Sequence, residues 1–104
     1  MKILLVAFLL PVALANGAGP LETTAIVSRI KRQPVVSTAL ASVGYSKRLH
    51  ALEIEFVNGA IYRYLGVEAP TYRELLAAES KAHYYDENIR GRYRSFHVRR
   101  RLDY

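Results

Sequence analysis

Hydrophobic and polar residues alternate with a period of two along the middle of the chain, as in a half-buried β-strand. Over residues 49–57, Leu52, Ile54 and Phe56 alternate with two glutamates. Residues 35–45 carry small and β-branched side chains with the same alternation, interrupted by a glycine. The pattern therefore predicts two neighbouring strands, with their apolar side chains on one face of a sheet.

A tight turn is predicted directly after the second of these strands. Asn58 and Gly59 follow it, and a third β-like run occupies residues 60–65. Asn-Gly between two such runs favours a two-residue hairpin loop, because a type I′ turn needs positive φ at both central residues. Such a loop places Glu55 opposite Tyr62, which fixes the expected register.

The register decides which side chains of the hairpin share a face. With a two-residue loop, Tyr62 and Tyr64 lie beside the glutamates, and Arg63 intrudes on the apolar face. A slip of one residue would exchange these faces, because side chains alternate along a strand. Exposed tyrosines beside arginines suit stacking on bases or sugar rings. The alternative is that the C-terminal segment covers the tyrosines, which then belong to the core with their hydroxyls at its rim.

Helices are expected after the third strand. Pro70 suits the first helical position, where its missing N–H costs nothing. Alternatively, Thr71 is the cap and Glu74 completes a capping box. The helix should end near residues 80–83, and a second short helix is expected from Asp86. The predicted fold is therefore α+β, with a small three-stranded antiparallel β-meander followed by one or two short α-helices.

The N-terminus has the features of an export signal. Lys2 precedes an uncharged apolar run over residues 3–14, which closes on the small residues Ala13 and Ala15. This order predicts a secretory signal peptide over residues 1–15. The alternative, a membrane anchor, needs about 20 apolar residues. We therefore expect an exported protein, periplasmic or secreted, with no stable membrane anchor after signal cleavage.

The rest of the chain divides into three predicted parts. Residues 16–34 form a linker, in which residues 25–27 suit either a short strand or a helical turn; residues 35–95 form the folded domain, and residues 96–104 a basic C-terminal tail. The chain has 104 residues and no cysteine. Because small exported domains often rely on disulfides, this one must depend on core packing or on a partner.

The net charge of +6 is carried mainly by basic residues near the two ends of the mature chain. Such a distribution suits binding to a polyanion, either nucleic acid or an acidic polymer. Two alternatives are a basic surface with no specific partner and a protein–protein interaction module of the cell envelope. The candidate ligand-binding residues are Tyr62, Arg63, Tyr64, Arg90, Arg92, Tyr93 and Arg94.

Catalytic chemistry finds little support in the sequence. The three histidines lack the spacing of metal ligands. Ser80, His83 and Asp86 are three residues apart and would meet on a helix, but no motif supplies the oxyanion hole that such a triad needs. We therefore expect no enzyme, no metal and no cofactor.

An ordered series of short motifs runs through the predicted domain: residues 37–45, Leu52-x-Ile54-x-Phe56-x-Asn58-Gly59, Tyr62-x-Tyr64-x-x-Val67, Pro70-x-Tyr72-x-x-Leu75, Ala78-x-Ser80 and Ile89-Arg90-x-x-Tyr93. Over residues 36–93 this series resembles the KTSC domain, a small module named for its place at the C-terminus of some lysyl-tRNA synthetases. The resemblance implies a compact α+β domain, no catalytic activity and a role in binding nucleic acid. Ala82 departs from the pattern, which usually has Gly there, and the export signal does not fit a setting on tRNA.

Overall fold

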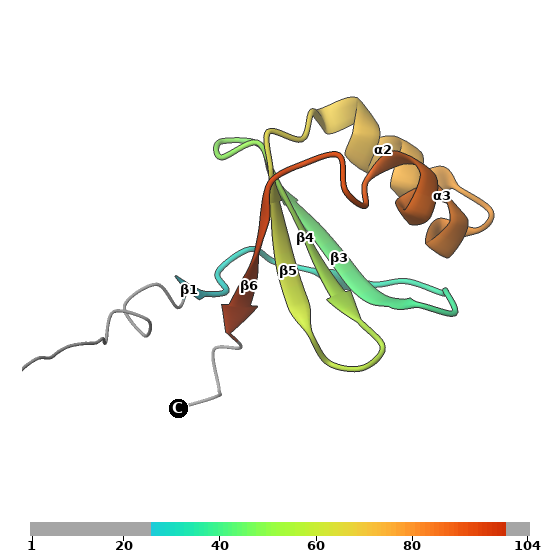
Figure 1. Ribbon diagram of the computed structural model, residues 1–104, viewed down its shortest axis with the longest axis horizontal. Coiled ribbons are helices and arrows are strands. Elements are labelled where there is room, and N and C mark those ends of the chain that lie inside the picture. Colours follow the sequence, from blue (N-terminus) through green and yellow to red (C-terminus); the bar gives the residue numbers. More distant parts are fainter. Residues whose placement is uncertain (1–25, 100–104) are drawn as a thin grey trace, which may run out of the picture.

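The computed structural model describes residues 26–99. The predicted signal peptide, the first part of the predicted linker and the end of the predicted tail lie outside this range. Within it, a six-stranded sheet packs against a pair of helices (Figure 1). The strands are β1 (Ile26–Val27), β2 (Gln33–Pro34), β3 (Leu40–Ser46), β4 (Ala51–Phe56), β5 (Ile61–Leu65) and β6 (Ser95–Arg99), and the helices are α2 (Ala69–Ala77) and α3 (Lys81–Asn88).

The predicted α+β fold is confirmed, and the sheet is larger than predicted. The three strands of the predicted meander, β3, β4 and β5, form its centre, and the order of strands is β1-β6-β5-β4-β3-β2. All neighbouring strands are antiparallel except β1 and β6. Strands β1 and β2 come from the predicted linker and β6 from the predicted tail, so both segments belong to the sheet in their described parts.

The hairpin between β4 and β5 differs from the prediction by one residue. Its loop has three residues, because the Phe56 N–H donates to the Ala60 carbonyl over 2.8 Å. Gly59 has a φ of 95°, whereas Asn58 is not among the residues with positive φ. The turn is therefore of the three-residue kind that ends on a left-handed glycine, not a type I′ turn. Asn58 instead accepts a hydrogen bond on its side-chain oxygen from the Ala60 N–H, over 2.9 Å.

This slip exchanges the two faces of β5. Glu55 pairs with Ile61, and Glu53 pairs with Arg63, so Arg63 shares a face with the glutamates. The tyrosines of β5 turn to the other face, where Tyr64 lies opposite Leu52. The predicted placement of Arg63 among the apolar residues is therefore wrong, and so is that of the two tyrosines beside the glutamates.

The main core lies between the sheet and the helices. Leu75 of α2 and Ile89 after α3 are fully buried against the central strands. Tyr64 is only 4% exposed. The buried members of this core are Leu40, Val43, Leu52, Ile54, Tyr64, Val67, Leu75 and Ile89. Bulky tyrosines around them supply much of the apolar volume that a chain without disulfides needs.

Both helices start where local chemistry favours it. Helix α2 follows Glu68, which makes no side-chain cap hydrogen bond, so Pro70 is its second residue and not the predicted first. Thr71, the alternative cap, lies inside the helix, which ends at Ala77, before the predicted residues 80–83. Helix α3 starts at Lys81, earlier than predicted, because the Ser80 hydroxyl accepts a hydrogen bond from the His83 N–H over 3.2 Å. No helix within residues 26–99 is long and apolar enough to cross a membrane.

Candidate functional site

The sheet face opposite the helices carries a buried carboxylate, that of Glu53, which is 0% exposed. Arg63 of β5 donates to one of its oxygens from Nε and Nη2, over 3.1 and 2.9 Å. Arg32 donates to the other oxygen from Nη1, over 2.8 Å. The Ser28 hydroxyl donates to that second oxygen as well. The carboxylate is therefore held by two guanidinium groups and a hydroxyl, as a buried charge requires.

Arg32 and Ser28 reach this site because the segment between β1 and β2, residues 28–32, crosses the face of the sheet (Figure 1). A glycine makes room for the crossing. A Cβ atom at Gly44 of β3 would lie 2.2 Å from the Lys31 carbonyl oxygen. Gly44 is also the residue that pairs with Glu53 across the strands. Any larger residue there would push the segment off the sheet and away from the carboxylate.

A second carboxylate completes the network. Ser42 accepts a hydrogen bond from Arg32 Nε over 3.1 Å and donates to Glu55 over 2.9 Å. Glu55 also lies 4.0 Å from Arg32 Nη2. The network thus contains two arginines and two glutamates, and its formal charge is zero. No buried side-chain nitrogen or oxygen in the described part of the chain lacks a hydrogen-bond partner.

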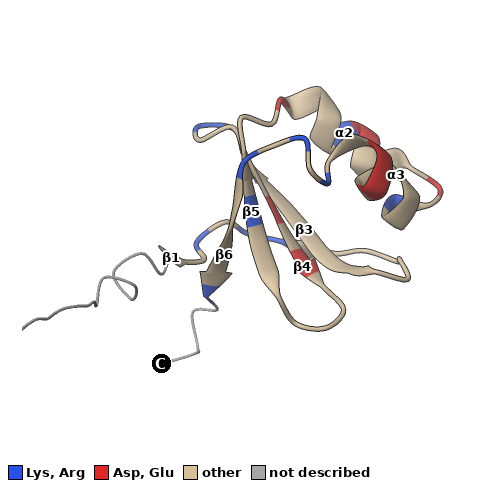
Figure 2. Cartoon of the chain, in the orientation of Figure 1, with Lys and Arg blue, Asp and Glu red and all other residues tan. Residues whose placement is uncertain are grey.

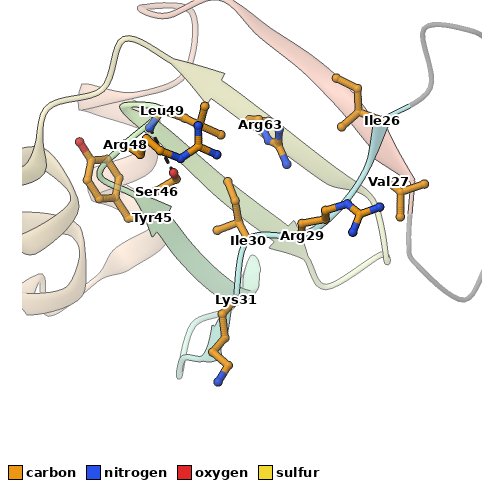
Figure 3. A pocket seen from close by; sticks show the side chains of 10 residues that line it. All are labelled: Ile26, Val27, Arg29, Ile30, Lys31, Tyr45, Ser46, Arg48, Leu49 and Arg63. Atoms are coloured by element: carbon orange, nitrogen blue, oxygen red, sulfur yellow. Dashed lines mark hydrogen bonds between the residues drawn. The ribbon is translucent and has the colours of Figure 1, made fainter.

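An open pocket of about 450 Å³ lies beside this network, between the crossing segment and the turn that joins β3 to β4 (Figure 3). It is lined by Ile26, Val27, Arg29, Ile30, Lys31, Tyr45, Ser46, Arg48, Leu49 and Arg63. Four of these ten residues are basic and none is acidic. In Figure 3 the head groups of Arg48 and Arg63 lie over the sheet, whereas Lys31 extends away from them.

The basic residues of the pocket come from three separate parts of the chain. Arg29 and Lys31 belong to the crossing segment, Arg63 to β5, and Arg48 to the β3–β4 turn. His50 closes that turn with a φ of 51°, and its carbonyl accepts a hydrogen bond from the Val67 N–H over 3.0 Å. Within residues 26–99, Arg29, Lys31 and Arg48 form no ion pair with a carboxylate. Their charges therefore remain available at the pocket.

The tyrosines predicted to bind a ligand belong to the core instead. The Tyr64 hydroxyl shares a hydrogen bond with that of Tyr85 in α3 over 2.7 Å. Burial, followed by this hydrogen bond, raises the pKa of Tyr64 well above its usual range. Tyr62 is half-buried and packs edge-on against Phe56 and His97. Tyr93 is also half-buried and packs against the same core. Tyr64 is therefore part of the core, and Tyr62 and Tyr93 are packed against it with part of their surface exposed.

Three of the four predicted arginines, Arg90, Arg92 and Arg94, lie together on the connection between α3 and β6. All are exposed. Arg90 pairs with Asp86 over 3.5 Å, and Arg92 Nε donates to the Glu87 carbonyl over 2.9 Å. The Arg94 carbonyl accepts a hydrogen bond from the N–H of Leu65, at the end of β5, over 2.9 Å. This arginine loop and the β3–β4 turn adjoin the same end of the sheet (Figure 2). Among the predicted site residues, only Arg63 lines the pocket.

The spacing of Ser80, His83 and Asp86 does not assemble a triad. Ser80 caps α3, His83 Nε2 lies 3.1 Å from Glu87, and Asp86 pairs with Arg90. Over residues 26–99 there is no group of three side chains that would hold a metal ion.

Taken together, these features define a small α+β domain with helices on one face of its sheet and a basic pocket on the other. Residues 36–93 match the model of the KTSC domain family, and the chain belongs to that family. The match includes the meander, both helices and Arg48 and Arg63. It leaves out β1, the crossing segment, β2 and β6.

A solved structure agrees with this assignment, and two further proteins are similar in sequence. An uncharacterised protein of Stutzerimonas stutzeri is 36% identical over 58 residues, which are 56% of this chain and 82% of that protein. A protein of Tsukamurella paurometabola is 35% identical over 63 residues, 61% of this chain and 94% of its own length. The crystal structure of a KTSC domain protein from Yersinia pestis is similar with a TM-score of 0.65 and 33% identity. That similarity covers 68% of this chain and 100% of the other.

Proposed function

We propose that this protein is an exported, non-enzymatic module that binds a polyanion, nucleic acid or an acidic polymer, through its arginines. The observation that carries the proposal is the basic pocket, which has four cationic residues and no acidic one among the residues that line it. Arginine is well suited to this role, because its fixed fork of N–H donors matches oxyanions.

The arrangement of the cations supports a polymeric ligand. The β3–β4 turn, whose Arg48 lines the pocket, and the arginine loop, Arg90 to Arg94, adjoin one end of the sheet (Figure 2). An extended anion could contact both in turn. The attraction is mainly electrostatic and without sequence preference, because it acts through charge and because Tyr64 is buried in the core.

The experiment is a titration of the mature protein against fluorescent single-stranded DNA, RNA and an acidic polysaccharide, at low and at high salt. We expect binding at low salt that weakens steeply as salt increases. Comparison of the three polymers tells a nucleic acid from another polyanion. Absence of binding to all three at low salt would overturn the proposal.

Charge variants test the assigned surface. We expect the triple variant Arg90→Gln, Arg92→Gln, Arg94→Gln to weaken binding. On a single strand it should also reduce the salt slope by roughly 0.7 for each phosphate that the arginines no longer neutralise. Arg73→Gln, on the exposed side of α2, is the matched control and should leave binding unchanged. If Arg73→Gln weakens binding as much as the triple variant does, the arginine loop is not part of the binding surface.

A second candidate function is a protein–protein interaction module of the cell envelope. It is favoured by two exposed apolar side chains, Val36 and Val57, which are 92% and 62% exposed. This function predicts an envelope partner whose binding resists high salt and is lost in Val36→Asp. Binding that is lost at high salt and insensitive to Val36→Asp would reject it.

A further inference from the structure

We infer that the pocket contains a phosphate subsite between Arg48 and Arg63. At this subsite the domain binds one phosphate group of its ligand. This inference rests on the proposed function and deepens it, because it assigns a chemical class of ligand and two residues that bind it. Neither the KTSC match nor the sequence motifs assign this site.

Arg63 supplies donors in a fixed position. Its Nε and Nη2 are committed to one oxygen of Glu53, at 3.1 and 2.9 Å, and Glu53 is completely buried. Nη1 takes no part in that fork. The guanidinium is therefore held in one orientation before any ligand arrives, so that little conformational entropy is lost on binding.

Arg48 supplies charge. The network of two arginines and two glutamates is formally neutral, so the positive charge of the pocket comes from Arg29, Lys31 and Arg48. Of these three, Arg48 belongs to the β3–β4 turn and places its head group over the sheet, as Arg63 does, whereas Lys31 extends away (Figure 3). The positive charges of these three residues repel one another, because no carboxylate among the lining residues pairs with them. A bound anion would reduce this repulsion.

The chemistry favours phosphate over a carboxylate. A tetrahedral phosphate offers oxygens in several directions, so it can accept from two guanidinium groups that approach from different elements. Here they approach from the β3–β4 turn and from β5. Ile30 projects toward the space between the two head groups and, with Leu49, gives the pocket an apolar wall (Figure 3). An apolar wall excludes water and strengthens the interaction between the charges.

The test follows the arginine Nε–Hε resonances by NMR while the protein is titrated with inorganic phosphate. Acetate at equal ionic strength serves as the carboxylate arm. We expect the signals of Arg48 and Arg63 to shift in a saturable way with phosphate and to stay in place with acetate. Arg48→Gln should weaken the phosphate titration by roughly tenfold, since it removes a charge-assisted hydrogen bond. Arg73→Gln, on α2 across the sheet, should leave it unchanged.

Two results would overturn the subsite: unmoved signals of Arg48 and Arg63 in phosphate, or equal phosphate affinity in Arg48→Gln and the unaltered protein. Arg63→Lys provides a second variant, because it keeps a cation opposite Glu53 but loses the fork. We expect it to stay folded and to bind phosphate more weakly, and unchanged binding would also count against the subsite.

The subsite and the proposed function can fail separately. If single-stranded DNA binds at low salt while the two arginine signals stay unmoved, the subsite is wrong and polyanion binding stands. If phosphate shifts those signals but none of the three polymers binds, the subsite stands and the polymeric ligand is wrong. Saturation by phosphate together with displacement by the oligonucleotide would place the nucleic-acid backbone in the pocket.

Discussion

Arg63 and Glu53 face each other across β5 and β4, and the guanidinium forks onto a single carboxylate oxygen at 3.1 and 2.9 Å. The same carboxylate receives Arg32 from the crossing segment. One buried charge thus connects the centre of the sheet with a segment that lies outside the family match. The Glu53 carboxylate holds in place the crossing segment, which contributes Arg29 and Lys31 to the pocket. Fold and candidate function therefore depend on the same carboxylate.

Glu53→Gln should lower the free energy of unfolding by about 3–5 kcal/mol, because it leaves two guanidinium groups in a poorly solvated site without their main counter-charge. Urea denaturation followed by far-UV circular dichroism measures the change. Glu79→Gln, at an exposed position between the helices, is the control and should stay within about 0.5 kcal/mol. A decrease below about 1 kcal/mol for Glu53→Gln would contradict a central role for this carboxylate.

Gly44→Ala should displace the crossing segment, because the new methyl group would meet the Lys31 carbonyl oxygen at 2.2 Å. Overpacking of this kind costs about 1–3 kcal/mol. Limited trypsin digestion detects the displacement as faster cleavage after Arg29 and Lys31. Cleavage after Arg92 in the arginine loop provides the internal reference and should not change. Equal rates at Lys31 in both proteins would show that the segment does not depend on this glycine.

Tyr64→Phe should cost about 1 kcal/mol of stability, because it removes the hydrogen bond between the Tyr64 and Tyr85 hydroxyls. It should leave polyanion affinity unchanged, since the ring is buried under α3. Parallel urea and DNA titrations separate the two effects. If the variant is as stable as the original protein but binds DNA more weakly, the Tyr64 hydroxyl contributes to binding and not to stability.

The protein should lose stability in alkaline solution. Burial, and next the hydrogen bond from its hydroxyl to Glu74 at 2.8 Å, raise the pKa of Tyr84 to about 12. Its unfolded pKa is about 10. The folded state therefore favours the protonated phenol, and this stabilisation is complete below about pH 10 and declines as pH rises toward 12. The pKa of Tyr64 is raised as well, which acts in the same direction.

Urea midpoints measured between about pH 9 and pH 11.5 check this dependence. Tyr84→Phe should show a shallower decline, because one of the phenols that resist ionisation is gone. A steeper decline in the variant, or a midpoint independent of pH in both proteins, would contradict the assignment.

The sequence is sufficient to predict the central meander and the region in which the first helix starts, because alternation in residues 49–57 and the position of Pro70 are local signals. The predicted end near residues 80–83 is too late, since α2 ends at Ala77. The predicted register is wrong because Asn-Gly is compatible with loops of two or three residues, and only the three-residue loop turns Tyr64 inward. The tertiary core selects the loop: Tyr64 fills space under α3 that Arg63 could not fill without a partner for its charge.

The candidate site lies beyond local prediction for a different reason. Its basic residues come from the crossing segment, the β3–β4 turn and β5, and only the fold brings them together. Strands β1 and β2 have two residues each, too few to show a period. In β6, Phe96 and Val98 alternate with polar residues, and this pattern is typical of a strand. The sequence of the predicted tail therefore contains a signal for β6.

The parallel pairing of β1 with β6 places Ile26 beside Val98. The first and last described residues therefore leave the sheet from one corner. A short peptide could join them there, and the exposed loop at Asn58 could be opened to provide new ends, so the fold should accept circular permutation. A permuted protein would carry any fused reporter on the hairpin, at the end of β4 and β5 away from the β3–β4 turn and the arginine loop.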